Sequence, residues 1–183
     1  MVRRLPALVA LAAALTACSD KGSNGGDPVA WAEKVCKSVD SQIAVLTQLP
    51  NASPSDPVRG KESLLKLASD YAAALDRMVG DIRSAGAPPV TDGSQVVDKV
   101  TNALQDARKA VESARGTLEK AQVTDVASFQ KAYTTFIEDL SNASGFEEPT
   151  KDLKSNAQLN DAFNKAPTCQ KLDGETPSTP PSR

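Results

Sequence analysis

The sequence predicts an all-α protein, built as an up-and-down four-helix bundle with a short fifth C-terminal helix. Apolar residues recur at alternating spacings of three and four along several long stretches, which places them on one face of a helix. Aspartate, proline and glycine stand between these stretches, where helices start and stop. No stretch alternates apolar and polar residues, as a half-buried strand would. These observations together favour packed helices over any sheet.

The first residues have the layout of an export signal. Arg3 and Arg4 precede an uncharged apolar run that extends from Leu5 to Ala17. This run of 13 residues is too short to cross a membrane, which takes about 20 residues. A basic start, a short apolar run and small residues at its end are typical of a signal peptide. We therefore expect residues 1–17 to be removed from the mature protein.

The run closes with Leu15-Thr16-Ala17-Cys18. This stretch resembles the lipobox of bacterial lipoproteins, in which the cysteine receives a diacylglyceryl group and becomes the new N-terminus. The resemblance implies lipid attachment at Cys18 and a domain anchored at the extracytoplasmic face of the cell membrane. Two acyl chains give stable anchoring, whereas one gives only marginal binding. The alternative is an ordinary secretory signal with an incidental Cys18, which would leave an exposed thiol in an oxidising compartment.

Two further cysteines, Cys36 and Cys169, remain after Cys18 is assigned to the lipid. In an exported chain, two cysteines are expected to pair with each other. The bond would join the two ends of the domain and, on the chain-entropy view, would stabilise it by about 4–5 kcal/mol. The alternative is a pair of free buried thiols.

The chain ends are polar and frame one domain. Residues 18–27 contain several glycines and are expected to form a flexible tether. Residues 173–183 consist mainly of threonine, serine and proline, and are expected to be disordered. The helical bundle then occupies residues 28–172.

The first two helices have the same start signal. Asp27-Pro28 and Asp56-Pro57 each combine a good N-cap with a proline that is tolerated at the first helical position. Prolines from Pro50 onward end the first helix, and Gly86 ends the second. The apolar stripes are Ala32, Cys36, Val39, Ile43 and Leu46 in the first helix, and Leu64, Ala68, Tyr71, Leu75, Met78 and Ile82 in the second.

The remaining helices follow the same rules. The third begins between Asp92 and Ser94, and the fourth is expected to be capped by Thr124. A shorter fifth helix is expected from about residue 150 to 165, ended by Pro167, with Cys169 just beyond it. The third stripe is Val97, Val100, Leu104, Ala107, Val111, Ala114, Leu118 and Ala121, and the fourth is Val126, Phe129, Tyr133, Phe136 and Leu140. Charged residues on the other side of the third helix are read as a solvated face.

Composition excludes several kinds of chemistry. The chain has no histidine, which removes Ser-His and Cys-His nucleophilic pairs and the histidine ligands of di-iron and haem bundles. No glycine-rich phosphate loop or calcium loop is present, so we expect no catalytic residues, no cofactor and no metal. Without the signal, 19 basic residues face 23 acidic ones, a net charge of −4. This balance speaks against nucleic-acid binding, which rests on lysine and arginine.

Some residues invite a structural or a functional interpretation. Trp31 is expected to pack under the C-terminal segment, although it could instead meet headgroups or a partner. Gly80 and Gly116 lie inside helices and would mark close backbone contact or a small groove. A pocket in the bundle core could involve Tyr71, Met78, Tyr133 and Phe136. The hydroxyls of the two tyrosines would need partners if buried, and a place at the rim of the core explains the tyrosines equally.

As a whole, the chain resembles small lipoproteins and secreted proteins of actinobacteria, through its lipobox, its alanine-rich composition, the early Cys36 and the closing stretch from Ala162 to Cys169. The resemblance implies a location and no reaction. The first hypothesis is a non-enzymatic, membrane-tethered helical domain that contacts an envelope component or a protein partner. The alternative is a lipoprotein that binds a small hydrophobic ligand in the bundle core. A lined cavity would favour the second, and a filled core with an exposed apolar patch the first.

Overall fold

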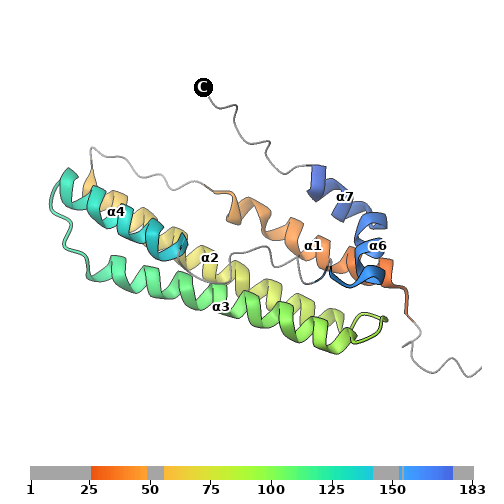
Figure 1. Cartoon of the computed structure of the whole chain (residues 1–183). Coiled ribbons are helices and arrows are strands. Elements are labelled where there is room, and N and C mark those ends of the chain that lie inside the picture. Colours follow the sequence, from red (N-terminus) through yellow and green to blue (C-terminus); the bar gives the residue numbers. More distant parts are fainter. Residues whose placement is uncertain (1–25, 49–55, 142–152, 154, 175–183) are drawn as a thin grey trace, which may run out of the picture.

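A computed structural model of the chain describes residues 26–48, 56–141, 153 and 155–174. These residues form helices and no strand, so the prediction of an all-α protein is confirmed for them. Two long antiparallel helices, α2 (Pro57–Ala85) and α3 (Gly93–Lys120), run the length of the molecule (Figure 1). With 29 residues, α2 is about 43 Å long.

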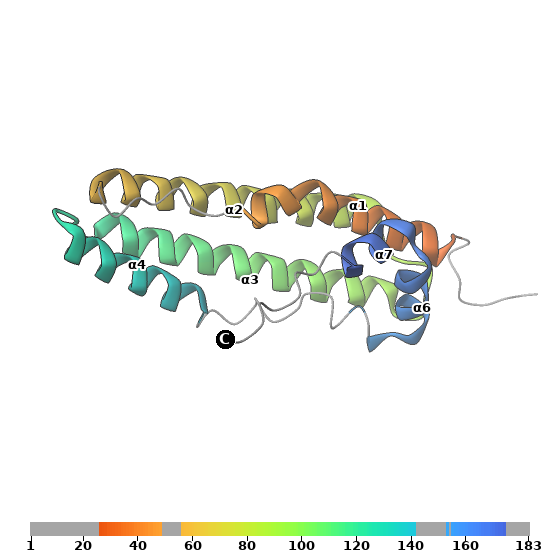
Figure 2. The same ribbon diagram turned by 90° about the horizontal axis from the view of Figure 1, so that it is seen from above.

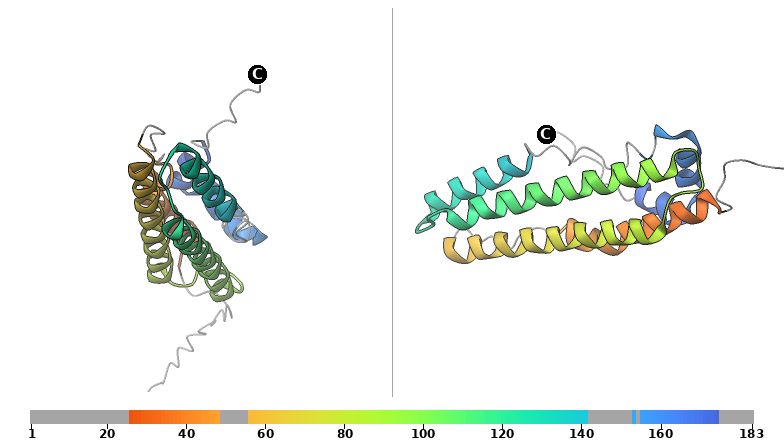
Figure 3. Two further views of the ribbon diagram at one scale, coloured as in Figure 1. Left: turned by 90° about the vertical axis from the view of Figure 1, so that its left-hand side faces the viewer. Right: turned by 90° about the horizontal axis from the view of Figure 1, so that it is seen from below.

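The other helices cover different ends of this α2–α3 hairpin. Helix α4 (Val126–Ser141) packs on α3 and on the beginning of α2. Helix α1 (Pro28–Leu46) packs on the other half of α2, and the short helices α6 (Ala157–Lys165) and α7 (Pro167–Gly174) pack on α1 (Figure 2). Seen from below, α4 and the α6–α7 pair lie at opposite ends of the hairpin (Figure 3).

The predicted starts of α1 and α2 are confirmed. The Asp27 carboxylate accepts a hydrogen bond from the Val29 N–H at 2.9 Å, and the Asp56 carboxylate accepts one from the Arg59 N–H at 3.1 Å. Each satisfies a backbone donor that the helix itself leaves free. Helix α2 ends at Gly86, whose φ of 73° suits glycine.

The start of α4 differs from the prediction. Asp125 takes the capping role expected of Thr124, because its carboxylate accepts hydrogen bonds from both the N–H and the hydroxyl of Ser128, at 2.8 and 2.7 Å. These bonds lower the pKa of Asp125. The residues flanking a helix start were recognised correctly, and only the choice between two adjacent capping residues was wrong. The sequence also predicts that the fourth helix stops at Gly145, which lies outside the described residues.

The C-terminal region holds two helices where one was predicted. Helix α6 begins at Ala157, with the Asn156 side chain as its cap. Pro167, expected to end helical structure, instead occupies the first position of α7, which places Cys169 inside a helix and extends regular structure to Gly174. Proline breaks the interior of a helix but suits its first turn, and spacing alone does not distinguish the two cases.

The apolar stripes meet in one core. Its most completely buried side chains come from several helices: Leu64, Leu104, Val111, Leu118 and Leu159. Leu153, between α4 and α6, is buried as well. The predicted stripe of α3 is shifted at its start, because Val96 is buried and Val97 only partly so. Such a shift is compatible with the heptad spacing, because the apolar face of a core helix is wider than a single row of residues.

The charged side of α3 is only in part a solvated face. Asp98, Lys109 and Glu112 are exposed as expected. Arg108 is half-buried and joins α3 to α2 through an ion pair with Asp76, at 2.8 Å. Arg115 is also half-buried, and nothing in the structure explains why its Nε atom has no hydrogen-bond partner among the described residues.

The glycines that matter are not the two singled out from the sequence. A Cβ atom on Gly80 or Gly116 would meet nothing within 4 Å, so neither marks a close contact. A Cβ on Gly93 would lie 2.1 Å from the Pro88 carbonyl oxygen, and one on Gly60 would lie 2.8 Å from the Phe129 ring. Gly93 permits the tight turn before α3, and Gly60 lets α4 approach α2.

Candidate functional site

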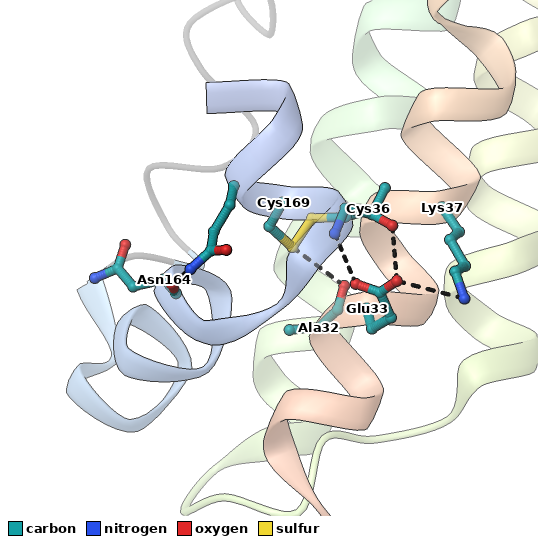
Figure 4. The surroundings of a disulfide bond; sticks show 8 residues. Ala32, Glu33, Cys36, Lys37, Asn164 and Cys169 are labelled. Carbon is teal, nitrogen blue, oxygen red and sulfur yellow. Dashed lines mark hydrogen bonds and ion pairs between the residues drawn. A yellow bond between two sulfur atoms is a disulfide. The ribbon is translucent and has the colours of Figure 1, made fainter. Parts of the chain in front are cut away.

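The two ends of the domain meet where α7 lies against α1. Cys36 and Cys169 form a disulfide with an S–S distance of 2.04 Å and Cα atoms 5.2 Å apart (Figure 4). Both residues are buried. The predicted pairing is therefore confirmed, and it links positions 133 residues apart in the sequence.

A carboxylate on α1 caps α7 beside this disulfide. Glu33 accepts a hydrogen bond from the Thr168 N–H at 2.9 Å and another from the Thr168 hydroxyl at 2.7 Å (Figure 4). These bonds lower the pKa of Glu33, and the nearby Lys37 ammonium, 3.4 Å away, contributes a smaller part. A second ion pair joins Lys171 of α7 to Asp40 of α1 at 3.3 Å. Sequence reasoning missed this cap, although Pro-Thr is a plausible helix start.

Trp31 strengthens the same region, and its predicted structural role is confirmed. Its ring is buried and meets Phe163 of α6 edge to face, with centroids 6.2 Å apart. Its indole N–H donates to the Gly86 carbonyl oxygen at 2.7 Å. One side chain thus connects α6 to the end of α2, while its polar atom has a hydrogen-bond partner.

The interface between α1 and α2 contains a polar seam. The Ser38 hydroxyl donates to Asp81 at 2.7 Å, and one turn further the Arg77 Nε donates to the Gln42 side-chain oxygen at 3.1 Å. Ser38 and Gln42 are both buried. Such pairs fix the register of two helices, because a slip would leave buried polar groups without partners.

The four residues expected around a core pocket have different environments. Met78 and Phe136 are buried in the core. Tyr71 is half-buried, and its hydroxyl donates to the Leu46 and Gln48 carbonyl oxygens at the end of α1. Tyr133 is 39% exposed, contrary to its predicted place on a buried stripe. None of the four lines the surface hollows described here, and a pocket formed by them stays a prediction.

Helix α4 exposes apolar side chains outward. Val126, Tyr133 and Ile137 are 43%, 39% and 40% exposed, and their spacings of seven and four place them on one side of the helix. We call these three residues the α4 stripe. Phe129, Ala132 and Phe136, on the adjacent side, are buried against the hairpin. The apolar face of α4 is therefore wider than the part of it that packs against the hairpin.

Three surface hollows border these elements. One of about 240 Å³ lies between α3 and α4 and is lined by residues such as Thr117, Ser128, Lys131 and Thr135. The other two, of about 490 and 290 Å³, adjoin each other beside α1 and share Lys34 and Ala85. Their linings are mixed, with hydroxyl and charged groups beside apolar ones.

Within the described residues, histidine, cysteine, aspartate and glutamate side chains form no cluster able to hold a metal ion. No helix in this part of the chain is long and apolar enough to span a membrane. Cys18, the expected lipid attachment site, lies outside the described residues, as do the expected signal and most of the tether. Comparison of the chain with protein-family models, with curated proteins and with solved structures found no match.

Proposed function

We propose that the mature protein is a lipoprotein, held at the extracytoplasmic face of the cell membrane by lipid on Cys18, and that its helical domain binds an envelope or protein partner without catalysing a reaction. The proposal includes a four-helix, up-and-down bundle for α1 to α4. The packing of α1 on α2 and of α4 on α3 supports this arrangement. The Cys36–Cys169 disulfide supports an oxidising location, because such bonds persist mainly outside the cytoplasm.

The α4 stripe is the observation that carries the partner-binding part. Small soluble proteins expose isolated apolar residues routinely, but here three lie on the same side of one helix, with the exposed Gln130 between Val126 and Tyr133. A helix face of this kind suits contact with another protein, with tyrosine supplying both apolar area and a hydroxyl. Apart from Ile43, the predicted apolar stripes of α1, α2 and α3 lie in or against the core, and no observation on the described residues favours a hydrophobic ligand there.

Site-specific crosslinking tests the partner-binding surface. A photoreactive residue at position 133, expressed in the host and activated in intact cells, is expected to give a defined adduct. Ile137→Asp should abolish the adduct, because a charge in an apolar contact is desolvated without a partner. Val58→Asp is the matched control, since Val58 is 54% exposed on α2 and does not belong to the stripe. Equal loss with both variants, or adduct retained with Ile137→Asp, would contradict the proposal.

Intact-mass measurement on protein extracted from host membranes tests the anchor separately. The expected mature chain starts at Cys18, carries added lipid mass and lacks two hydrogens because of the disulfide. Cys18→Ser should release the domain from the membrane fraction while its unfolding transition is unchanged. An unlipidated chain with a free Cys18 thiol would overturn the anchor and leave the α4 surface to be judged by crosslinking.

A further inference from the structure

Four outward positions of α4 follow a spacing that is the same in both directions along the helix. Three are the residues of the α4 stripe, Val126, Tyr133 and Ile137, and the fourth is the exposed Gln130. Their spacings are four, three and four, as in the a and d positions of helices that pack along a shared line. We call these four residues the α4 row. Because the spacing is symmetric, a second copy of α4 laid antiparallel presents the same row to it.

The antiparallel pairing brings residues of matching chemistry together. Val126 of one copy faces Ile137 of the second copy, so apolar surface meets apolar surface at both ends of the row. Between these ends, Gln130 faces Tyr133 of the second copy, and an amide and a phenol can each donate and accept a hydrogen bond. A twofold axis makes every contact occur twice. None of the four residues is charged, so the pairing places no like charges opposite each other within the row.

The charges of α4 favour the antiparallel over the parallel arrangement. Glu138 and Asp139 lie near the C-terminal end of the helix, whose last turn has no basic residue. A parallel pair would gather these carboxylates from both copies at one end. An antiparallel pair separates them and places each acidic end beside the start of the other helix, where the helix dipole is positive and Asp125 is engaged in the cap. Lys131 points elsewhere, because it lines the hollow between α3 and α4.

The position of α4 leaves the row accessible, and its length sets the strength of the contact. Helix α4 lies along one side of α3 (Figure 2), and among the described helices it contacts only α3 and α2. The row extends over about three turns, roughly 17 Å. A stable interface buries about 800 Å² on each partner, more than such a row supplies, so the pairing is expected to be weak in free solution. Anchoring both copies to one membrane would raise their effective concentration.

We propose that the partner of the α4 stripe is a second copy of this chain, bound antiparallel through the α4 row at the membrane surface. The proposal rests on the proposed function, because it assigns an occupant to the partner-binding surface described there. It is separate from the claim that this surface binds a protein at all, since a different protein could occupy the same stripe.

Paired cysteines test the arrangement on the full chain in host membranes. Val126→Cys combined with Ile137→Cys should give a disulfide-linked dimer on non-reducing electrophoresis. The two positions lie about 16 Å apart along one helix, too far for a bond within a chain, whose Cα atoms must lie within about 7 Å. Either substitution alone should lose most of the dimer, because each position faces the other and not itself. Val58→Cys with Ile137→Cys is the matched control and should not crosslink, since Val58 is exposed on α2 outside the row.

Gln130 gives a second readout in the same crosslinking assay. A polar residue at such a position costs stability, so adding Gln130→Leu to the paired-cysteine variant should increase the dimer. Gln130→Glu should decrease it, because the carboxylates of the two copies would lie near the twofold axis. Circular dichroism should show that every variant is folded. Dimer from Val126→Cys alone, equal dimer from the Val58 control, or no dimer from the paired cysteines would overturn the proposal.

The photoreactive residue at position 133 separates this proposal from the proposed function. The expected adduct has twice the mass of the chain and contains two copies of it. An adduct with a different protein would overturn the pairing of two copies and leave the proposed partner surface standing. Absence of any adduct would overturn both.

Discussion

At one end of the α2–α3 hairpin, α7 is attached to α1 by a disulfide, a carboxylate cap and an ion pair. At the other end, α4 is held mainly by apolar packing, with Phe129 seated on Gly60. Helix α4 starts six positions after α3 ends, whereas the contact of α7 with α1 closes a separation of more than 130 residues. The entropy lost in closing a loop grows with its length, so the distant segments gain most from a covalent link.

The largest effect is expected from removing that link. The double variant Cys36→Ala/Cys169→Ala should lose about 4 kcal/mol of unfolding free energy, because its unfolded chain is no longer cross-linked. Urea titration followed by circular dichroism measures the loss. Cys18→Ala serves as the control and should leave the urea midpoint of unfolding unchanged. An unchanged midpoint in the double variant would mean that packing on α1 alone secures the C-terminal helices.

The turn between α2 and α3 offers the next largest effect, close to the disulfide-linked end. Gly93→Ala should destabilise the protein by about 3 kcal/mol, because the new Cβ would lie 2.1 Å from a backbone oxygen that cannot turn away. Thermal unfolding would register this as a lower Tm. Wild-type stability for this variant would show that the turn rearranges at little cost.

At the α4 end, Gly60→Ala should cost about 2 kcal/mol, because the Cβ would press on the buried Phe129 ring. Gly80→Ala in the same helix is the matched control. Nothing lies within 4 Å of that position, so alanine should stabilise α2 by about 1 kcal/mol. If urea titration shows a lower unfolding free energy for Gly60→Ala and a higher one for Gly80→Ala, the close contact of α4 with Gly60 is confirmed. Changes of the same sign in both variants would contradict it.

The smallest effects compare the two capping carboxylates as the pH falls. Hydrogen bonds lower the folded-state pKa of Glu33, through Thr168, and of Asp125, through Ser128. Each contribution is therefore fully present above the unfolded pKa and is lost as the pH falls through the folded one. The ordinary pKa values are 4.5 and 3.8, so the loss at Glu33 should begin at the higher pH.

Glu33→Gln and Asp125→Asn should both be less stable than the wild type at neutral pH and should approach it in acid. Hydrogen exchange of the Thr168 amide should accelerate only in the Glu33 variant, and that of the Ser128 amide only in the Asp125 variant. A stability difference that does not depend on pH would show that the carboxylate charge is not what stabilises the helix start.

Much of this protein follows from local pattern. The starts of α1 and α2 were recognisable because an aspartate followed by proline supplies both a cap and a preset backbone angle. The disulfide was predictable because only Cys36 and Cys169 remained once Cys18 was assigned to the lipid. The buried position of Trp31 also followed from its place beside the first apolar stripe.

Other features depended on contacts between distant residues. Pro167 could end one helix or begin another, and the Glu33 carboxylate, 135 positions from Thr168, is what caps the start of α7. Periodicity indicated that Tyr133 shares a face with apolar neighbours, but how far the hairpin covers that face is set by tertiary packing. The same holds for Gly60 and Gly93, whose importance lies in the atoms that approach them. Spacing along a chain determines which residues share a helix face, and only the folded structure decides what lies against it.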